Sequence, residues 1–393
     1  MTSRPVRHLF VSQDYPPDLG GMARRHVELC RRLLPDEVVV STVAAPGADA
    51  FDHAEPYTIH RQAFVFGEAK KFARQLEWSR GLVRDVLPGR TILHLGNIRP
   101  CGYAVAVATR RVQVPYLVYV NGGDLLRVRR KVARNPVRRW TARDVMARSV
   151  GVVANSQWTA SLARDVMAEV GVRSMPVVAA IDLGTDPAQF APGRDRGLLR
   201  RRYGIGNAPL LVTVARLVPH KGQDVAIEVL ATLGSDARYL IAGAGADRGR
   251  LEQLAAARGV ADRVVFAGPL PDDEIAEAYA TATVYVGLSR VDSDVNAEGF
   301  GISFVEASAS GVPVVAGDSG GVRSAVRDGE TGFVVPPRDH AAAAAAIGRL
   351  LADPTLRTYM GQAGRRAVET HYNWDRVASE TRAFALHATG LTP

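Results

Sequence analysis

Short apolar runs recur along the chain, and each is followed by a turn rich in glycine, proline or polar residues. Runs of this kind predict buried strands. Between them, as in the stretch after Met22, apolar residues return at helical spacing and predict amphipathic helices. The alternation of strands and helices in both halves predicts an α/β protein of two doubly wound, Rossmann-like domains. The runs that predict strands span residues 8–12, 38–43, 91–95, 116–120, 151–156, 210–214, 239–242, 264–270, 284–289, 312–316 and 332–335.

The stretch 180–196 interrupts this alternation. It contains Pro187, Pro192, glycines and several acidic residues, a composition that is typical of a loop. A chain of 393 residues is also too long for one ordinary domain and sufficient for two. We therefore predict an N-terminal domain over residues 1–183 and a C-terminal domain over residues 184–371.

The chain carries a formal net charge of +9 and has a pI of about 9.8. This excess of positive charge suits an anionic substrate, an anionic membrane surface or a nucleic acid. Cys30 and Cys101 are far apart and lack metal-ligand spacing, which indicates a reducing, cytoplasmic compartment rather than a disulfide framework. No apolar run reaches the roughly 18 residues of a membrane span, and Met1 to Arg7 lead into a strand pattern rather than a signal-peptide core.

Two glutamates frame the stretch in the second half that carries the clearest chemistry. Glu298 precedes a Gly-Phe-Gly bend, and Glu306 lies in the apolar run that follows it. A helix that begins near Gly301 directs its free N–H groups toward an anion such as a diphosphate. The two carboxylates could then hold hydroxyl groups on either side of that diphosphate, as in a nucleotide-sugar. Two glutamates alone are more often a helix-end acid and a solvent-facing residue, but the flanking glycines lower the weight of that alternative.

Charged and glycine residues also follow two other predicted strands. Arg216 and Lys221 come directly after the strand 210–214, where two cations could neutralise a diphosphate and stabilise it as a leaving group. The alternative is an ordinary surface arginine and lysine. Gly20 and Gly21 lie between a strand and a helix, which is the phosphate-facing position in doubly wound sheets. A tight turn with positive φ would explain these glycines equally well.

The residues from Glu298 to Gly321, and then 328–332, resemble in order the E-x7-E region of the family-4 retaining glycosyltransferases, which have the GT-B fold. Arg216 and Lys221 resemble the R-x4-K pair of that family. The sequence Arg-Leu-Val-Pro-His-Lys-Gly-Gln-Asp that begins at Arg216 is especially similar to bacterial phosphatidylinositol mannosyltransferases. The resemblance covers nearly the whole chain and is densest from residue 211 to 336.

This resemblance implies a retaining transfer of sugar from a nucleoside-diphosphate-sugar, with GDP slightly favoured over UDP, to a small-molecule or lipid acceptor. No cofactor and no bound metal are expected. The family's roles place Arg216 and Lys221 on the departing diphosphate and Glu298 on the sugar, with Glu306 on the ribose. The terminal segment 372–393 is expected to pack back on the N-terminal domain. Donor-binding positions of the family fall on Gly20, Gly21, Gly243, Leu270, Phe300, Gly301, Ile302 and Glu306.

Asn121 and Asp124 follow the strand 116–120 and are therefore candidates to bind the acceptor or the sugar. Simple turn chemistry is the alternative. In the family, histidine often stands at the place of Asn121, so this difference leaves open an unusual sugar or acceptor. The basic segment 127–148, which Pro136 divides, could dock peripherally on the inner face of a membrane or could be a solvated helical face. Nucleic acid binding is not expected, since no aromatic platform or known module is present.

Three further patterns give weaker alternatives. Asp292-Ser293-Asp294 matches the short D-x-D metal motif, but such matches are frequent by chance, and we do not expect a metal there. The glycines at 243–245 match a dinucleotide fingerprint only in part, which argues against a redox site. A nucleotide-sugar epimerase of the same fold, or a non-catalytic protein that binds sugar nucleotides or membranes, are the rival functions.

Overall fold

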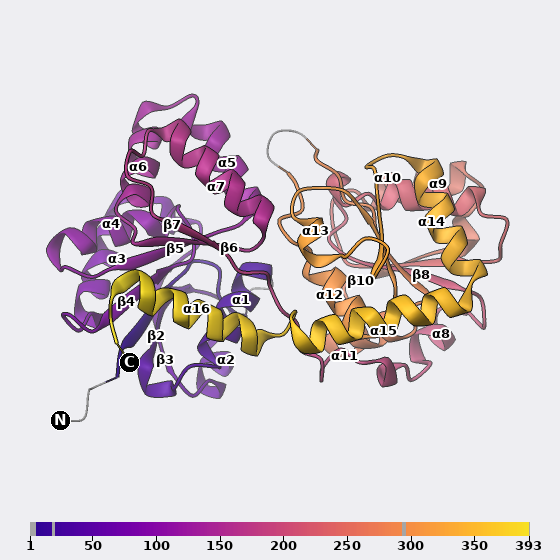
Figure 1. The fold of residues 1–393 in the computed structure, drawn as a ribbon, viewed down its shortest axis with the longest axis horizontal. Helices are drawn as coiled ribbons and strands as arrows, with labels where there is room; N and C mark the ends of the chain where they lie inside the picture. Colours follow the sequence, from indigo (N-terminus) through magenta and orange to yellow (C-terminus); the bar gives the residue numbers. More distant parts are fainter. Residues whose placement is uncertain (1–4, 18–19, 293–295, 393) are drawn as a thin grey trace. The chain divides into compact units, whose positions relative to one another are not determined.

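The computed structural model describes residues 5–17, 20–292 and 296–392 of the chain. It divides into two compact units (Figure 1). Unit 1 consists of Met1–Ile181 together with Trp374–Pro393, and unit 2 consists of Asp182–Asn373. Both boundaries lie two residues from the positions expected from the sequence. Each unit contains one parallel sheet with helices around it, and each is described here by itself.

Unit 1 is built on a seven-stranded parallel sheet in the order β3-β2-β1-β4-β5-β6-β7. The order reverses between β1 and β4, which makes this a doubly wound sheet. Its strands are β1 (Arg7–Val11), β2 (Val38–Ala44), β3 (Thr58–Val65), β4 (Thr91–Leu95), β5 (Tyr116–Val120), β6 (Gly151–Ala154) and β7 (Val177–Ala180). Its helices are α1 (Gly21–Cys30), α2 (Ala48–Ala54), α3 (Phe72–Asp85), α4 (Cys101–Arg111), α5 (Gly122–Val132), α6 (Pro136–Ala147), α7 (Gln157–Val170) and α16 (Trp374–Thr389).

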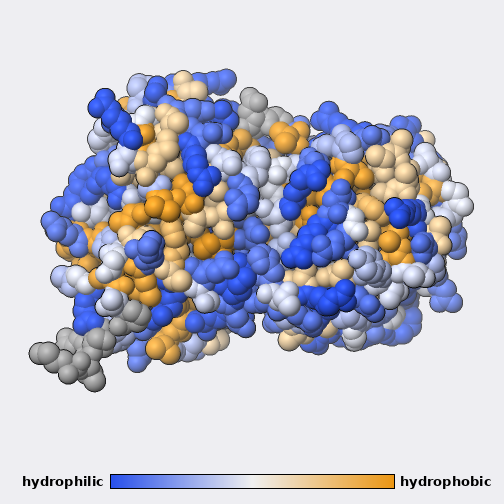
Figure 2. All heavy atoms as spheres, in the orientation of Figure 1, coloured by the Kyte–Doolittle hydropathy of each residue, from blue (hydrophilic) through white to orange (hydrophobic). Residues whose placement is uncertain are grey.

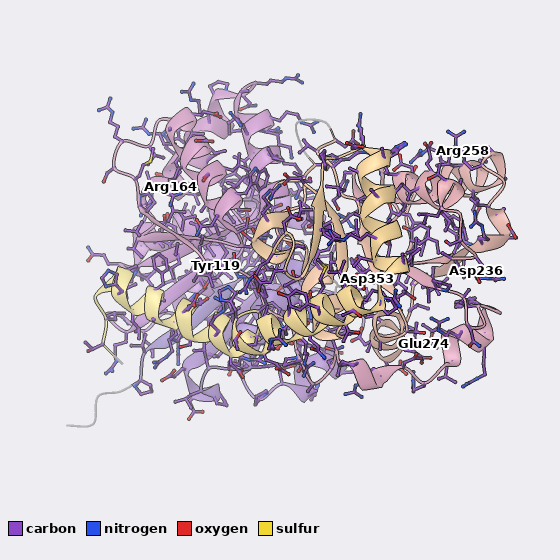
Figure 3. The ribbon with its side chains drawn as sticks, turned by 45° about the vertical axis from the view of Figure 1, so that its right-hand side comes forward. Tyr119, Arg164, Asp236, Arg258, Glu274 and Asp353 are labelled. Carbon is purple, nitrogen blue, oxygen red and sulfur yellow. The ribbon has the colours of Figure 1, made fainter. Side chains whose placement is uncertain are left out.

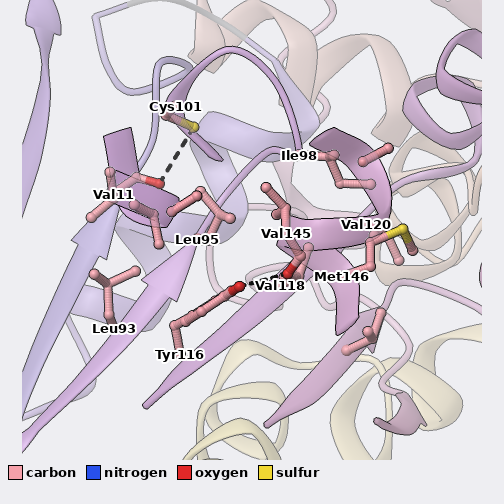
Figure 4. Close-up of a cluster of buried hydrophobic side chains, with 14 of the residues drawn as sticks. Val11, Leu93, Leu95, Ile98, Cys101, Tyr116, Val118, Val120, Val145 and Met146 are labelled. Atoms are coloured by element: carbon pink, nitrogen blue, oxygen red, sulfur yellow. Dashed lines mark hydrogen bonds between the residues drawn. The ribbon is translucent and has the colours of Figure 1, made fainter. Parts of the chain in front are cut away.

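The central strands of unit 1 are buried on both faces, since helices cover both faces of the sheet. Figure 4 shows part of this core, in which Leu93 and Leu95 of β4 lie among the side chains of β5 and α6. The Tyr116 hydroxyl donates a hydrogen bond to the Val145 carbonyl at 2.6 Å, so the one polar atom of that ring is satisfied. The edge strands β3 and β7 were not predicted, because they are partly exposed and lack a continuous buried run.

The basic segment 127–148 forms parts of two helices, α5 and α6. Pro136 is the first residue of α6, where its missing N–H costs nothing. Asn135 caps this helix, and its side chain accepts a hydrogen bond from the Arg138 amide at 2.9 Å.

The terminal helix α16 belongs to unit 1, where Arg32 Nε at the end of α1 lies 2.6 Å from Asp375 Oδ1. In the described part of the chain, no helix is both long and apolar enough to cross a membrane.

Unit 2 is built on a six-stranded parallel sheet in the order β10-β9-β8-β11-β12-β13, which reverses between β8 and β11. Both units are therefore doubly wound α/β units, as the sequence predicted. The strands are β8 (Leu210–Val214), β9 (Arg238–Ala242), β10 (Val264–Gly268), β11 (Val284–Gly287), β12 (Val314–Gly317) and β13 (Gly332–Val335). The helices are α8 (Leu198–Arg202), α9 (Gln223–Thr232), α10 (Arg248–Ala257), α11 (Asp272–Ala280), α12 (Ile302–Ala309), α13 (Val322–Ala325), α14 (His340–Ala352) and α15 (Pro354–Thr370).

Candidate active site

The candidate donor site lies in unit 2, where the strand order of the sheet reverses. β8 and β11 are neighbours, but the chain continues from β8 to β9 on one side and from β11 to β12 on the other. In doubly wound sheets, ligands bind outside the carboxyl ends of the strands at this point. The loop that carries Arg216 and Lys221 follows β8, and the connection that carries Glu298 follows β11. The fold thus places these three predicted residues at one edge of the sheet.

Lys221 and Glu298 form an ion pair across this edge. Lys221 Nζ lies 2.5 Å from Glu298 Oε2, and the two side chains are 19% and 14% exposed. The Glu298 carbonyl accepts a hydrogen bond from the Gly321 amide at 2.8 Å, which fixes its backbone to the turn after β12. Two residues that are 77 positions apart in the chain are therefore joined directly.

The local charges decide the protonation state of Glu298. Burial raises its pKa, but the charge and hydrogen bond of Lys221 oppose burial, and His220 and the Gly299 amide add to this effect. The net result is a pKa below the usual value for glutamate. Glu298 is therefore an ionised carboxylate at physiological pH, able to accept hydrogen bonds from hydroxyl groups of a ligand.

Arg216 is the second cation of this loop, and His220 lies in the loop directly before Lys221. Arg216 is exposed, and within the described residues no hydrogen bond or ion pair of its guanidinium is found. Burial, and then the charge of Lys221, lower the pKa of His220, so its imidazole is neutral at physiological pH. Arg216 therefore offers a cation that an anionic ligand could reach without breaking an existing pair.

The backbone of this loop is fixed by hydrogen bonds from neighbouring elements. The Arg216 carbonyl accepts from Gln223 Nε2 at 3.1 Å, and the His220 carbonyl accepts from the Arg290 amide at 2.9 Å. The first bond comes from the start of α9 and the second from the chain after β11. Because the partners lie on separate elements, the loop keeps its position without a ligand.

Two glycines allow the loops at this edge to pack backbone against backbone. Gly222 has a φ of +74°, and a Cβ there would lie 1.9 Å from the Leu288 carbonyl oxygen. Gly243, a predicted donor-binding residue after β9, has a φ of +138°, and its Cβ would lie 2.0 Å from the Ala215 carbonyl oxygen. Both positions require glycine for conformation and for space. Leu270, another predicted donor-binding residue, is half-buried and follows β10 at the same edge.

Helix α12 begins at this edge. Its N-cap residue, Gly301, has a φ of +93° and makes no side-chain capping hydrogen bond to the first turn. A Cβ at Gly301 would lie 2.3 Å from the ring of Phe304, so a side chain does not fit there. Phe300 is buried, and Ile302 is half-buried at the first position of the helix. The first-turn amides and the positive end of the helix dipole are suited to an anion.

Glu306 lies inside α12, as the sequence predicted, and its side chain is largely buried. The Tyr279 hydroxyl, from α11, donates a hydrogen bond to Glu306 Oε2 at 2.6 Å. A buried carboxylate needs such partners to avoid a large desolvation cost. This contact holds the side chain of Glu306 in one orientation.

The remaining predicted residues belong to unit 1. Gly20 and Gly21 are exposed at the start of α1. Gly20 has an extended φ of 176°, and a Cβ there would meet no atom within 4 Å. A left-handed turn therefore does not explain Gly20, and no contact with the described residues of unit 1 requires a glycine there.

Asn121 and Asp124 lie at the start of α5, at the carboxyl edge of the first sheet. Asn121 precedes the helix, and its Nδ2 lies 3.6 Å from Met22 Sδ of α1. Asp124, in the first turn, forms an ion pair with Arg127 and accepts a hydrogen bond from Asn97 at 3.4 Å. The alternative of a simple turn is therefore wrong for these residues, which begin a helix. Their binding roles remain predictions.

No group of three or more His, Cys, Asp or Glu side chains is arranged to hold a metal ion in the described ranges 5–17, 20–292 and 296–392. Of the Asp292-Ser293-Asp294 motif, residues 293 and 294 lie outside the described residues. The expectation that this motif holds no metal therefore stays a prediction.

Sequence reasoning missed three side chains at or near this edge. Tyr279 was missed because only the fold brings α11 against Glu306. Asp224 and Arg290 form an ion pair between the start of α9 and the chain after β11. The available signal for Arg290 was its position, since it follows a buried strand by a few residues at the ligand-binding edge.

Comparison with known proteins gives the family. The model described as Glycosyl transferases group 1 matches residues 195–367. A protein named GDP-mannose-dependent alpha-(1-6)-phosphatidylinositol monomannoside mannosyltransferase, from Mycobacterium tuberculosis, is 30% identical over 96% of this chain and 97% of its own length. A protein of the same name from Mycolicibacterium smegmatis is 42% identical, over 49% of this chain and 51% of its own length.

The fold is also that of solved glycosyltransferase-like structures. The crystal structure of Anabaena Alr3699/HepE in complex with UDP has a TM-score of 0.79 to this chain and 19% identity, and the match covers 96% of this chain and 98% of that one. This likeness concerns the fold alone, which is GT-B. Together with the full-length relative from M. tuberculosis, it shows that the chain belongs to the group 1 glycosyltransferases and is an enzyme of sugar transfer.

Proposed function

We propose that this glycosyltransferase moves mannose from GDP-mannose, with retention at the anomeric carbon and without a bound metal, to an acceptor that carries an inositol-type anionic head group. The observation that carries the proposal is the cationic loop of Arg216 and Lys221 beside the ionised Glu298 at the ligand-binding edge of unit 2. The choice of GDP-mannose over a UDP-sugar rests on the names of the two mannosyltransferases.

In the proposed reaction, the bond between the anomeric carbon and the diphosphate oxygen breaks, and the electron pair leaves with GDP. Arg216 and Lys221 stabilise the growing negative charge, with amides of Phe300, Gly301 and Ile302 as further donors. The acceptor hydroxyl bonds to the anomeric carbon on the same face, and its proton passes to the departing phosphate oxygen. No side-chain nucleophile is required.

Glu298 and Glu306 bind the two ends of the donor in this proposal. Glu298, ionised and partly exposed, orients the hydroxyl groups of the sugar. Glu306, fixed by Tyr279, accepts the ribose hydroxyls. In the proposal, Gly243 and Leu270 lie near the nucleotide, and their place after β9 and β10 at the same edge of the sheet supports this. Gly20 and Gly21 at the diphosphate, and Asn121 and Asp124 at the sugar or acceptor, complete the predicted set.

An anionic acceptor is supported by the charges on α5 and α6. Burial, and then the charges of Arg99, Arg138 and Arg127, lower the pKa of Lys131, which places these cations near one another. Asp124 pairs with Arg127, and no hydrogen bond or ion pair of Lys131 is found in the described parts of the chain. A phosphate group would relieve the repulsion among these cations.

The exposed surface of α6 supports a lipid as the molecule that carries this head group. Val137 and Trp140 are 68% and 59% exposed, beside Arg138 and Arg139. Exposed tryptophan among arginines is typical of a helix that rests in the interface of an anionic membrane. Hydrophobic and hydrophilic residues lie interspersed on the face shown in Figure 2. We therefore favour a lipid acceptor and peripheral membrane contact through residues 127–148, with a free cyclitol as the alternative source.

The test supplies the purified protein with labelled GDP-mannose or UDP-glucose, together with vesicles that contain phosphatidylinositol monomannoside, or with free inositol. We expect label in the lipid from GDP-mannose only, in a product whose anomeric configuration, measured by NMR, equals that of the donor. Label in free inositol alone would instead support a soluble acceptor. Inversion, or isomerised donor without transfer, would contradict the proposed reaction.

Membrane contact is tested separately. We expect Trp140→Ser to reduce co-sedimentation of the protein with vesicles of anionic lipid, because it removes an interfacial anchor. Tyr359→Ser, at a residue that is 54% exposed on α15 of unit 2, is the matched control. Equal sedimentation of both variants and the unchanged protein would contradict a docking role of α6.

A further inference from the structure

A second ion pair lies close along the chain to the pair of Lys221 and Glu298. Both branches of the Arg290 guanidinium bind the Asp224 carboxylate, with Nη1–Oδ1 at 2.7 Å and Nη2–Oδ2 at 2.9 Å. The side chain of Arg290 is 8% exposed, and that of Asp224 is 19% exposed. Arg250 also approaches Asp224 Oδ2, at 3.4 Å. The charge and hydrogen bonds of Arg290 outweigh burial and lower the pKa of Asp224, so the carboxylate is ionised.

This pair connects the two chain segments that carry the reacting groups. Asp224 comes three residues after Lys221, and Arg290 lies near the start of the connection that leads from β11 to Glu298. The Arg290 amide also donates to the carbonyl of His220, the residue before Lys221. Arg290 thus contacts the Lys221 loop through its backbone amide and the start of α9 through its side chain.

Stability alone explains this pair poorly. A buried ion pair usually contributes no more stability than an apolar pair of the same size, because both charges lose their hydration. Arg290 Nε is buried and has no hydrogen-bond partner in the described structure, which adds to the cost. The arrangement instead fixes the two side chains relative to each other. A guanidinium that binds both carboxylate oxygens sets both the distance and the orientation between the two groups.

We propose that Asp224 and Arg290 are positioning residues that hold Lys221 at the distance from Glu298 which donor binding and leaving-group stabilisation require. This inference rests on the proposed function of Lys221. Neither residue needs to touch the donor. Loss of the pair should let the Lys221 loop move away from the chain after β11, so that the ammonium group no longer meets the diphosphate at its best distance.

The test is a double-mutant cycle of Asp224→Asn with Lys221→Met. Asparagine keeps the shape of aspartate but removes its charge. The affinity for GDP, measured by calorimetry, and kcat with GDP-mannose are the readouts. We expect Asp224→Asn to lower kcat by about tenfold in the unchanged protein and by less than about twofold in the Lys221→Met background, because residues that act through one another are not additive.

Glu274→Gln provides a matched control, since Glu274 on α11 (Figure 3) also accepts both branches of an arginine. Its two bonds to Arg202 are 2.7 Å each, and they join α11 to α8 rather than to the Lys221 loop. We expect this variant to leave kcat and GDP affinity unchanged. A loss equal to that of Asp224→Asn would mean that removing any such pair weakens the enzyme, and it would overturn the inference.

A second variant, Arg290→Lys, keeps the test valid if Asp224→Asn fails to fold. It keeps the charge but cannot bind both carboxylate oxygens, so we expect an intermediate loss of kcat with an unchanged melting temperature. Full activity of both variants, or equal effects of Asp224→Asn with and without Lys221, would overturn the inference while leaving the proposed function intact. No effect of Lys221→Met would instead refute the assigned role of Lys221. If GDP does not bind, the cycle is measured with UDP.

Discussion

Replacing Lys221 by methionine removes the ammonium group but keeps an apolar side chain of similar length. In the structure, this ammonium lies 2.5 Å from the Glu298 carboxylate, and both side chains are mostly shielded from solvent. The substitution therefore removes a cation from the proposed diphosphate site and leaves Glu298 without its main partner. Lys221→Arg, which keeps the charge, is the matched control.

The loss of activity follows from the role in leaving-group stabilisation. Removing one donor that stabilises charge in a transition state typically lowers kcat by about 10²–10³-fold, or about 2.7–4 kcal/mol. The effect on stability is smaller. Breaking a fully buried pair costs about 3–5 kcal/mol and an exposed pair about 0–1 kcal/mol, so this partly buried pair should cost about 2 kcal/mol. For a unit of this size, that corresponds to a decrease of about 4–8 °C in Tm.

The pH dependence gives an independent check. In the unchanged protein, Lys221 and His220 outweigh burial and keep the pKa of Glu298 below its usual value. The stabilising contribution of this carboxylate is present above the pKa of the unfolded chain and is lost as the pH falls through the lower folded pKa. Without Lys221, burial dominates and raises the pKa. The acid-side decline of kcat/KM should therefore move to higher pH in Lys221→Met and stay in place in Lys221→Arg.

The measurements are turnover of GDP-mannose, thermal unfolding, and kcat/KM across the acid range for the three proteins. Turnover of Lys221→Met within about threefold of the unchanged enzyme would refute leaving-group stabilisation by Lys221. An acid limb that does not move would show that Lys221 does not set the charge of Glu298.

Three further predictions concern the same edge of unit 2 and the start of α1. Glu306→Gln should lower GDP affinity by about tenfold in calorimetry, because the amide is a weaker acceptor for the ribose hydroxyls. Tyr279→Phe, which removes the hydroxyl that holds Glu306, should have a smaller effect. Equal GDP affinity in both variants and the unchanged protein would contradict the ribose-binding role of Glu306. Gly301→Ala, at a φ of +93° and with a clash against Phe304, should lower the melting temperature by the equivalent of about 1–3 kcal/mol. Gly20→Ala should leave the melting temperature unchanged and lower kcat, and a thermal loss equal to that of Gly301→Ala would contradict this distinction.

The regular parts of both units could be predicted because buried parallel strands are continuous apolar runs. Leu210–Val214 and Tyr116–Val120 are such runs, and their bounds agree with the structure. The edge strand Thr58–Val65 alternates exposed and half-buried residues, so its sequence resembles a loop. Pairing with a neighbouring strand, which no local pattern reveals, makes it a strand.

The site could be predicted where chemistry follows a strand directly. Lys221 and Glu298 are 77 residues apart, but each comes after a strand that ends at the same edge of the sheet. Their meeting follows from doubly wound topology. The pairing of Asp224 with Arg290 could not be predicted, because any nearby arginine could satisfy an aspartate on this charged chain. Arg250, for example, also reaches the same carboxylate.

The pair of Lys221 and Glu298 also bears on which ligand the site prefers. Without a ligand, the two charges satisfy each other, and a diphosphate that attracts Lys221 would leave Glu298 with fewer partners. A nucleotide-sugar supplies both an anion for the ammonium and hydroxyl donors for the carboxylate, whereas a free nucleoside diphosphate supplies only the anion. The loss of the ion pair between Lys221 and Glu298 is therefore offset at both side chains only when the complete nucleotide-sugar binds. In the proposed reaction, transfer of the sugar leaves Glu298 without hydroxyl partners, so re-formation of the ion pair with Lys221 would favour release of the nucleoside diphosphate.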